Sequence, residues 1–269
     1  MTRTAVESIR FSVEGADVRG YLHRPASRLE ATRARPGILI VPGFADTAVG
    51  PHTMHALLAR ELCAAGFAVL RFDYRGQGES DGSFREFTIE SGLSDVRHAR
   101  DFLMDSAGVE PEGLGVYGYS LGGALAAELA RDRDGPRAAV LLAPAAFLEP
   151  VFTAFFAPTH RQQMDREGWA DWLGWPVGRP FLTGLGRIDP VETLRGTSCR
   201  TLVIHGTADT EVPPENGRAY EAAGALLREL SDADHQFSSV RWQQMVFEHT
   251  ITWFSRFLRP EGDGGEGSA

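Results

Sequence analysis

Residues 114–130 read LGVYGYSLGGALAAELA. The first residues have the apolar character of a buried strand, and the Ala- and Leu-rich run from Leu121 to Ala130 favours a helix. Ser120 lies at the junction, with Gly118 two residues before it and Gly122 two residues after it. A strand that turns directly into a helix is the basic unit of a parallel sheet covered by helices.

The same alternation extends along most of the chain. We expect a hairpin of residues 8–13 and 18–23, further strands at 37–41, 68–72, 114–117, 138–142, 199–205 and 226–230, and helices at 53–65, 93–103, 121–130, 214–223 and 243–258. This pattern predicts an α/β fold with a mostly parallel central sheet and helices on both faces. Ligands of such sheets bind at the carboxyl ends of the strands.

One segment, residues 147–189, interrupts the alternation. We expect no clear strand in it, and aromatic residues are concentrated there: Phe147, Phe152, Phe155, Phe156, Trp169, Trp172, Trp175 and Phe181. The segment is too long for a bare connection, so the sequence predicts a lid inserted into a core of residues 1–146 and 190–259. A pair of core helices is the alternative. The Gly-rich end, residues 260–269, is predicted to be a disordered tail.

The amino-acid composition argues against several classes of function. The formal net charge of −9 and the absence of a basic patch argue against binding to nucleic acid or to an anionic membrane surface. All 27 basic residues are Arg, which excludes mechanisms that need a lysine, such as Schiff-base chemistry and the P-loop. Coding bias explains the missing lysines.

The two cysteines, Cys63 and Cys199, cannot form a disulfide framework and have no zinc-type spacing. Both lie in apolar stretches, so we expect buried, unreactive thiols. The N-terminus has no apolar signal-peptide region, and no apolar run is long enough to span a membrane. A cytoplasmic location is the expectation.

Ser120 is the candidate nucleophile. Glycines two residues before and after it permit a tight strand-to-helix turn that exposes the hydroxyl, which is the pattern of a nucleophile elbow. The N-terminus of the following helix favours negative charge at this point. A serine hydroxyl needs a base to remove its proton, and two downstream loops supply one base and one acid. Asp209 follows the strand at 199–205, and His235 follows the strand at 226–230.

These positions place His235 as general base and Asp209 as the acid that orients it. His205 is expected to be a core residue, and His98 and His249 to be surface or packing residues on helices. His52 and His55 lie near the expected site, where a structural or substrate-facing role is open. Asp232 and Asp234 are too close to His235 in sequence to orient its ring.

An oxyanion needs two backbone donors. Leu121 N–H, directly after the nucleophile, is one candidate. Phe44 N–H, in the loop after the strand at 37–41, is the other, because Gly43 would let the chain turn this amide toward the site. A strand-ending turn with a buried phenylalanine fits the same residues.

Several of these motifs together resemble the α/β-hydrolase superfamily. The resemblance rests on the elbow, on Gly206-Thr207-Ala208-Asp209, on Ala233-Asp234-His235 and on residues 72–82, FDYRGQGESDG. Residues 73–82, 142–146 and the insertion are similar to bacterial feruloyl and cinnamoyl esterases. The resemblance implies the same triad and oxyanion amides, and an insertion that roofs the acyl pocket. Pro42 and Tyr119 stand where relatives usually carry His.

The leading hypothesis is therefore a serine hydrolase for carboxylic esters with a hydrophobic or aromatic acyl group, without metal or organic cofactor. The candidate pocket residues are Tyr119, Phe155, Phe156, Trp169, Trp172 and Trp175, although packing of the lid is an alternative role for each. A thioesterase, acyltransferase or cyclase would use the same triad, and a non-catalytic binding protein is a third alternative. The expected partner is a small ester or thioester, and the sequence leaves a homodimer open.

Overall fold

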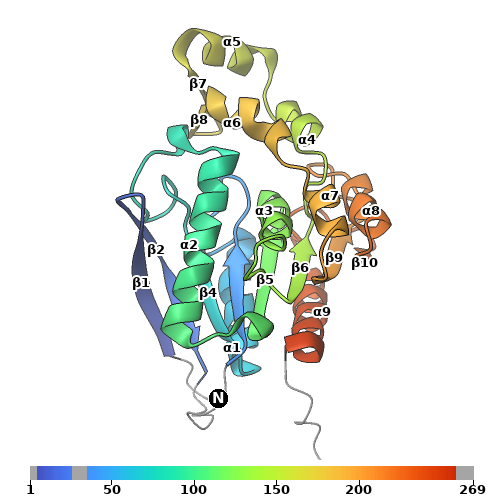
Figure 1. The fold of residues 1–269 in the computed structure, drawn as a ribbon. Coiled ribbons are helices and arrows are strands. Elements are labelled where there is room, and N and C mark those ends of the chain that lie inside the picture. Colours follow the sequence, from blue (N-terminus) through green and yellow to red (C-terminus); the bar gives the residue numbers. More distant parts are fainter. Residues whose placement is uncertain (1–4, 26–34, 259–269) are drawn as a thin grey trace, which may run out of the picture.

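The computed structural model describes residues 5–25 and 35–258, so the predicted tail lies outside the described residues. Its centre is an eight-stranded sheet in the order β1-β2-β4-β3-β5-β6-β9-β10 (Figure 1). The strands are β1 (Ala5–Val13), β2 (Ala16–Arg24), β3 (Gly37–Val41), β4 (Ala68–Phe72), β5 (Leu114–Tyr119), β6 (Ala138–Leu142), β9 (Arg200–Gly206) and β10 (Leu226–Leu230). A separate pair, β7 (Trp169–Trp172) and β8 (Trp175–Gly178), forms a small second sheet.

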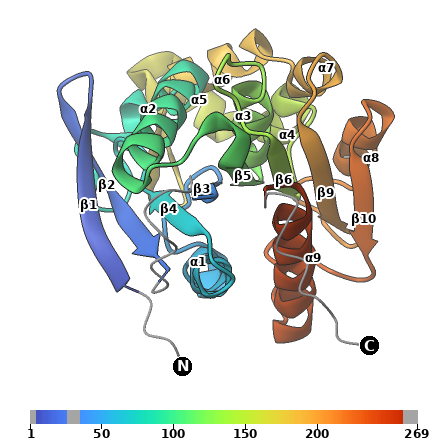
Figure 2. The same cartoon turned by 60° about the horizontal axis from the view of Figure 1, so that its bottom comes forward.

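The helices are α1 (Met54–Ala64), α2 (Ile89–Ala107), α3 (Leu121–Leu129), α4 (Leu148–Ala154), α5 (Pro158–Glu167), α6 (Arg179–Gly184), α7 (Pro190–Arg195), α8 (Glu215–Ala222) and α9 (Val240–Leu258). Short 3₁₀ turns are η1 (Pro51–Thr53), η2 (Phe84–Glu86), η3 (Pro111–Gly113) and η4 (Leu185–Arg187). Helices α1 and α9 cover one face of the sheet, and α2, α3, α7 and α8 cover the other (Figure 2).

Six neighbouring strands, from β4 through β3, β5, β6 and β9 to β10, run parallel, while β1 and β2 add an antiparallel edge. Every residue of β3, β4, β5 and β6 is buried, because helices cover both faces. The predicted α/β fold is confirmed. The carboxyl ends of the parallel strands meet at one edge, below α4, α6 and the β7–β8 sheet in Figure 1.

Element boundaries follow local signals. Strands β4, β6 and β10 have the predicted limits, but α2 is longer at both ends than the predicted 93–103. It begins after Thr88, whose hydroxyl accepts from Ser91 N–H while the Ser91 hydroxyl accepts from Thr88 N–H, and it ends at Gly108 with a left-handed φ of 65°. This reciprocal cap and glycine stop stabilise turns that the apolar periodicity does not mark.

The expectation of no strand within 147–189 is wrong. Trp169–Trp172 and Trp175–Gly178 pair antiparallel, with Trp172 opposite Trp175. The two turn residues between them, Leu173 and Gly174, have φ values of 53° and 87°. Positive φ at both positions is the geometry that closes a two-residue hairpin. The sequence signal for this hairpin is two short tryptophan-containing segments separated by Leu173 and Gly174. The signal is weak because leucine rarely adopts a positive φ.

Candidate active site

Ser120 occupies a strained turn between β5 and α3. Its φ is 55° and its ψ is −118°, although it is not glycine. A Cβ on Gly118 would lie 2.3 Å from the Gly122 carbonyl oxygen, and one on Gly122 would lie 2.3 Å from the Pro42 oxygen. The two glycines are therefore required by close backbone approach. Backbone strain of this kind persists only where surrounding contacts enforce it, and it is common at functional sites.

The structure brings Ser120, His235 and Asp209 together. The Ser120 hydroxyl lies 3.1 Å from His235 Nε2, and His235 Nδ1–H donates to Asp209 Oδ2 over 2.7 Å. All three residues are buried. They come from the exits of β5, β9 and β10, which are far apart in sequence but all end at the same edge of the sheet, with β6 between β5 and β9. The distances from Ser120 to His235 and from His235 to Asp209 are those that a nucleophile, its general base and an orienting acid would require.

The carboxylate of Asp209 is held in its ionised form. Burial raises its pKa, but hydrogen bonds from His205 and His235 lower it, and the net pKa is about 2. Asp209 Oδ1 also accepts from Glu211 N–H and Val212 N–H, at 3.0 and 2.8 Å. An ionised, oriented carboxylate can stabilise an imidazolium at His235.

The other candidate histidines do not contact Ser120 or His235, although His205 lies beside Asp209. His205 is fully buried, as expected, and its Nε2–H donates to the Val212 carbonyl at 2.8 Å, with Asp209 Oδ2 3.4 Å away. His98 is exposed on α2, and His249 is half-buried on α9. His52 contacts Ser238 at 3.1 Å, and His55 contacts Asp46 at 2.8 Å.

The two candidate oxyanion amides belong to Leu121, in the elbow, and to Phe44, in the loop after β3. Leu121 is the first residue of α3, so its N–H has no acceptor within the helix. Phe44 belongs to the loop after β3, and the described residues form no hydrogen bond to its N–H.

The reason given for Gly43 needs correction. The left-handed residue of this loop is Ala45, with a φ of 54°, and Gly43 has no positive φ. A Cβ on Gly43 would lie 3.1 Å from the Tyr119 ring and 3.3 Å from Ser120 Cβ. Glycine therefore favours close packing of this loop against the elbow and is not required for a turn.

The predicted pocket aromatics are engaged with one another and with the core. Trp172 stacks on Phe155 at 5.7 Å and contacts the Phe44 ring at 5.4 Å, and Trp175 meets Phe84 edge-on at 4.9 Å. Phe156 is fully buried, and Trp169 lies under the Arg85 guanidinium. The insertion thus places an aromatic wall beside the loop that carries Phe44.

Tyr119 contacts His235. Its hydroxyl donates to the His235 carbonyl over 3.2 Å, and its ring centroid is 5.2 Å from that of His235. The side chain is 5% exposed. These contacts support the loop that presents His235.

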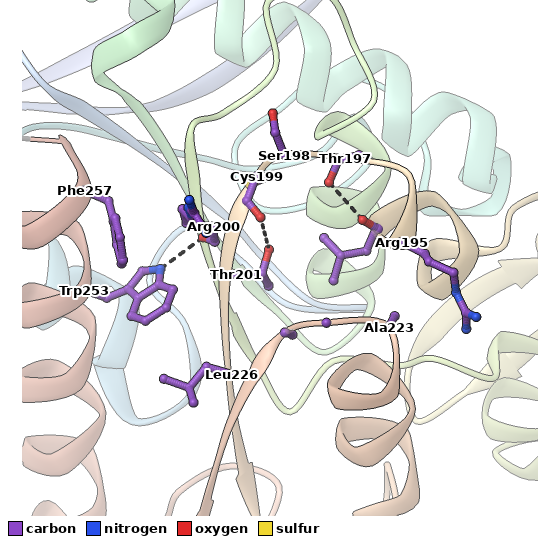
Figure 3. A pocket seen from close by; sticks show the side chains of 13 residues that line it. Arg195, Thr197, Ser198, Cys199, Arg200, Thr201, Ala223, Leu226, Trp253 and Phe257 are labelled. Atoms are coloured by element: carbon purple, nitrogen blue, oxygen red, sulfur yellow. Dashed lines mark hydrogen bonds between the residues drawn. The ribbon is translucent and has the colours of Figure 1, made fainter.

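A cavity of about 430 Å³ lies at the opposite end of the sheet, at the amino ends of β9 and β10 (Figure 3). Cys199 lines it and is only partly buried, so the expectation of full burial holds for Cys63 alone. Burial of the thiols still raises the pKa of Cys199 to about 12 and that of Cys63 to about 11. Both are therefore protonated and poorly nucleophilic near neutral pH.

Among the described residues, no group of three or more His, Cys, Asp or Glu side chains has the arrangement of a metal site. Within the same ranges, no helix is both long and apolar enough to cross a membrane.

The model of the family described as "Serine aminopeptidase, S33" matches residues 32–172, just over half of the chain. The chain belongs to this family of α/β-hydrolases. An uncharacterised Mycobacterium tuberculosis protein is 32% identical over 191 residues, which cover 71% of this chain and 58% of that protein. The lysophosphatidylserine lipase ABHD12 of Gallus gallus is 29% identical over 210 residues, which cover 76% of this chain and 51% of that protein. The chain thus spans about half the length of these curated relatives.

Solved structures share the hydrolase fold. Est1E from Butyrivibrio proteoclasticus, solved with ferulic acid bound, has a TM-score of 0.79 and 21% identity, with 93% of this chain and 99% of that one covered. DcsB, solved with a substrate analogue, has a TM-score of 0.74 and 16% identity. The match covers 94% of this chain and 100% of the DcsB chain. The sequence-based resemblance to the α/β-hydrolase superfamily is confirmed.

Proposed function

We propose that this α/β-hydrolase is a serine esterase that cleaves carboxylic esters with a hydrophobic or aromatic acyl group. The observation that carries the proposal is the continuous contact from Ser120 Oγ through His235 to Asp209 Oδ2, at 3.1 and 2.7 Å. A binding protein would need no such chain of contacts, whereas acyl transfer requires a base within reach of the nucleophile.

The proposed reaction has two halves. His235 Nε2 takes the hydroxyl proton while Ser120 Oγ attacks the ester carbonyl, and Asp209 stabilises the resulting imidazolium. His235 then returns the proton to the departing alcohol, which leaves an acyl group on Ser120. Water, deprotonated by His235, attacks this acyl-enzyme, and the carboxylic acid and free serine are released. The Phe44 and Leu121 amides would donate to the oxyanion in both halves.

The acyl preference is inferred from the insertion. Trp172 and Phe155 lie beside Phe44, so an acyl group held near the oxyanion loop would meet an apolar, aromatic wall. Est1E was solved with ferulic acid, an aromatic acid, whereas the ABHD12 relatives are lipases of a lysophospholipid. These two relatives suggest different acyl groups on the same fold.

The first experiment asks whether Ser120 is acylated. Wild-type protein is treated with a fluorophosphonate probe, and the labelled peptide is identified by mass spectrometry beside the Ser120→Ala variant. We expect labelling at Ser120 and loss of aryl-ester hydrolysis in the variant. No labelling of the folded wild type, or hydrolysis at the wild-type rate by Ser120→Ala, would overturn the proposal.

The second experiment ranks acyl groups by kcat/KM. The panel contains acetyl, long-chain acyl and hydroxycinnamoyl esters of one alcohol, together with a lysophospholipid. A preference for the hydroxycinnamoyl ester is expected from the aromatic wall, and a preference for the long aliphatic chain would overturn the aromatic assignment. Transfer to an added thiol or amine faster than hydrolysis would identify an acyltransferase that uses the same triad.

A further inference from the structure

A buried acid–histidine pair holds the loop after β3, residues 42–47. His55 Nε2–H donates to Asp46 Oδ2 over 2.8 Å, and the side chains are 0% and 14% exposed. The same carboxylate accepts from Gly43 N–H at 3.3 Å and from Thr47 N–H at 2.7 Å. One side chain therefore ties both ends of the loop together, and Phe44 lies between the tied points. The proposed mechanism uses neither Asp46 nor His55.

The hydrogen bonds of His55 indicate its tautomer. Its Nδ1 is buried and has no hydrogen-bond partner among the described residues. With a proton on Nε2 alone, this leaves a bare ring nitrogen, which is tolerated better than an N–H donor without an acceptor. The tautomer with Nε2–H therefore fits the site, and His55 acts as a donor to Asp46.

His55 also links this loop to the elbow. A Cβ on Gly50 would lie 2.4 Å from the His55 ring, so this glycine leaves the space into which the ring fits. The ring meets Tyr119 edge-on, with centroids 5.6 Å apart. Tyr119 directly precedes Ser120, and its hydroxyl holds the His235 carbonyl. His55 thus contacts Tyr119, which precedes Ser120 and bonds to the His235 backbone.

The loop needs such support because its backbone is strained. Ala45 adopts a φ of 54°, a left-handed conformation that is unfavourable for alanine. The Phe44 N–H next to it forms no hydrogen bond with the described residues, so no partner of its own fixes its direction. The hydrogen bonds close to this amide are those that Asp46 accepts from Gly43 N–H and Thr47 N–H.

We propose that Asp46 and His55 are positioning residues that direct the Phe44 N–H toward the oxyanion. This assignment rests on the proposed serine-esterase function. The two residues touch no reacting atom, and their effect is on the geometry of a donor that matters most when negative charge develops on the substrate oxygen. Their loss should therefore lower kcat and leave KM nearly unchanged.

The test compares His55→Leu, which removes the donor, with His55→Gln, whose side-chain N–H can replace Nε2–H. We expect His55→Leu to lower kcat for an aryl ester by about 10- to 100-fold, with KM changed by less than about 2-fold. His55→Gln should recover most of this loss. Asp46→Asn, which keeps the shape of the side chain, serves as the second variant if His55→Leu does not fold.

Thr193→Val is the matched control. It breaks the buried hydrogen bond from Thr193 to Glu128, 2.6 Å long, between α7 and α3. This variant should lose stability and retain kcat. It separates a general effect of removing a buried polar contact from an effect on the loop.

A binding measurement checks the same point without turnover. A trifluoromethyl ketone forms a hemiketal with Ser120 that carries the oxyanion, whereas the product acid does not. His55→Leu should bind the ketone more weakly by about the factor lost in kcat, and the acid equally well. An unchanged kcat or ketone affinity in folded His55→Leu and Asp46→Asn overturns the positioning role alone. Wild-type protein that is not acylated at Ser120 overturns the proposed function, and this assignment with it.

Discussion

The ring of Phe44 stacks on the ring of Phe181, with centroids 4.4 Å apart and planes 17° apart. Phe44 lies in the loop after β3, and Phe181 lies in α6 of the 147–189 insertion. Phe44 also contacts Phe84, Phe152 and Trp172. The side chain of one residue therefore joins the insertion to the core, beside its own amide, the candidate oxyanion donor.

Removal of the Phe181 ring should loosen this junction. We expect Phe181→Ala to lower the free energy of unfolding by about 3–5 kcal/mol, because Phe181 is fully buried and its loss leaves a cavity. Urea unfolding measures the change. Leu173→Ala is the control in the same insertion, since Leu173 is 83% exposed and its truncation should cost less than about 0.5 kcal/mol. Equal costs for the two variants would contradict the packing shown here.

Gly118 should not tolerate any side chain. The Cβ of Gly118→Ala would lie 2.3 Å from the Gly122 carbonyl oxygen, so the elbow must shift. We expect a loss of about 3 kcal/mol or more in the free energy of unfolding, or no folded protein. Gly186→Ala, with no atom within 4 Å of its Cβ and no positive φ, should change stability by less than about 1 kcal/mol. Thermal unfolding of both variants measures these changes in stability and tests the prediction.

Acid should weaken the contribution of Asp209 to stability. Its folded-state pKa is about 2, below the ordinary value of 3.8, so its stabilising effect is complete above about pH 4 and is lost as the pH falls toward 2. The lowered pKa corresponds to a stabilisation of the folded state by about 2 kcal/mol. The difference in unfolding free energy between wild type and Asp209→Asn should therefore shrink over this range. A difference that stays constant from pH 5 to pH 2 would refute the assignment.

Asn216 should hold the start of the insertion. Its side-chain oxygen accepts from Ala146 N–H at 2.9 Å and from Phe147 N–H at 3.1 Å. Asn216→Ala leaves both amides without this acceptor, at a cost of about 2–3 kcal/mol. Asn216→Asp keeps the acceptor and should cost less. Limited proteolysis within residues 147–189 should be faster in the Ala variant than in the Asp variant, and equal rates would speak against this role.

Local sequence patterns were sufficient to predict the strands of the central sheet and the elbow. Strands such as β3 and β6 are short, continuous apolar runs, and Gly118 and Gly122 mark a turn that only glycines permit. The hairpin at 169–178 was missed because Leu173 adopts a positive φ that its residue type disfavours. The role of Asn216 left no local signal, since its partners lie about 70 positions earlier in the chain.

The candidate site likewise has features that local sequence motifs predict and features that depend on long-range contacts. The motifs themselves show which residue types are available, and they put Ser120, Asp209 and His235 in strand-exit loops at the same edge of the sheet, because such motifs are local and parallel strands end at one edge. The folded structure was needed to show that Asp46 bonds to the loop of Phe44, that His55 contacts both Asp46 and Tyr119, and that the aromatics of the insertion pack around Phe44. These contacts join segments distant in sequence, and their geometry depends on how the whole chain packs.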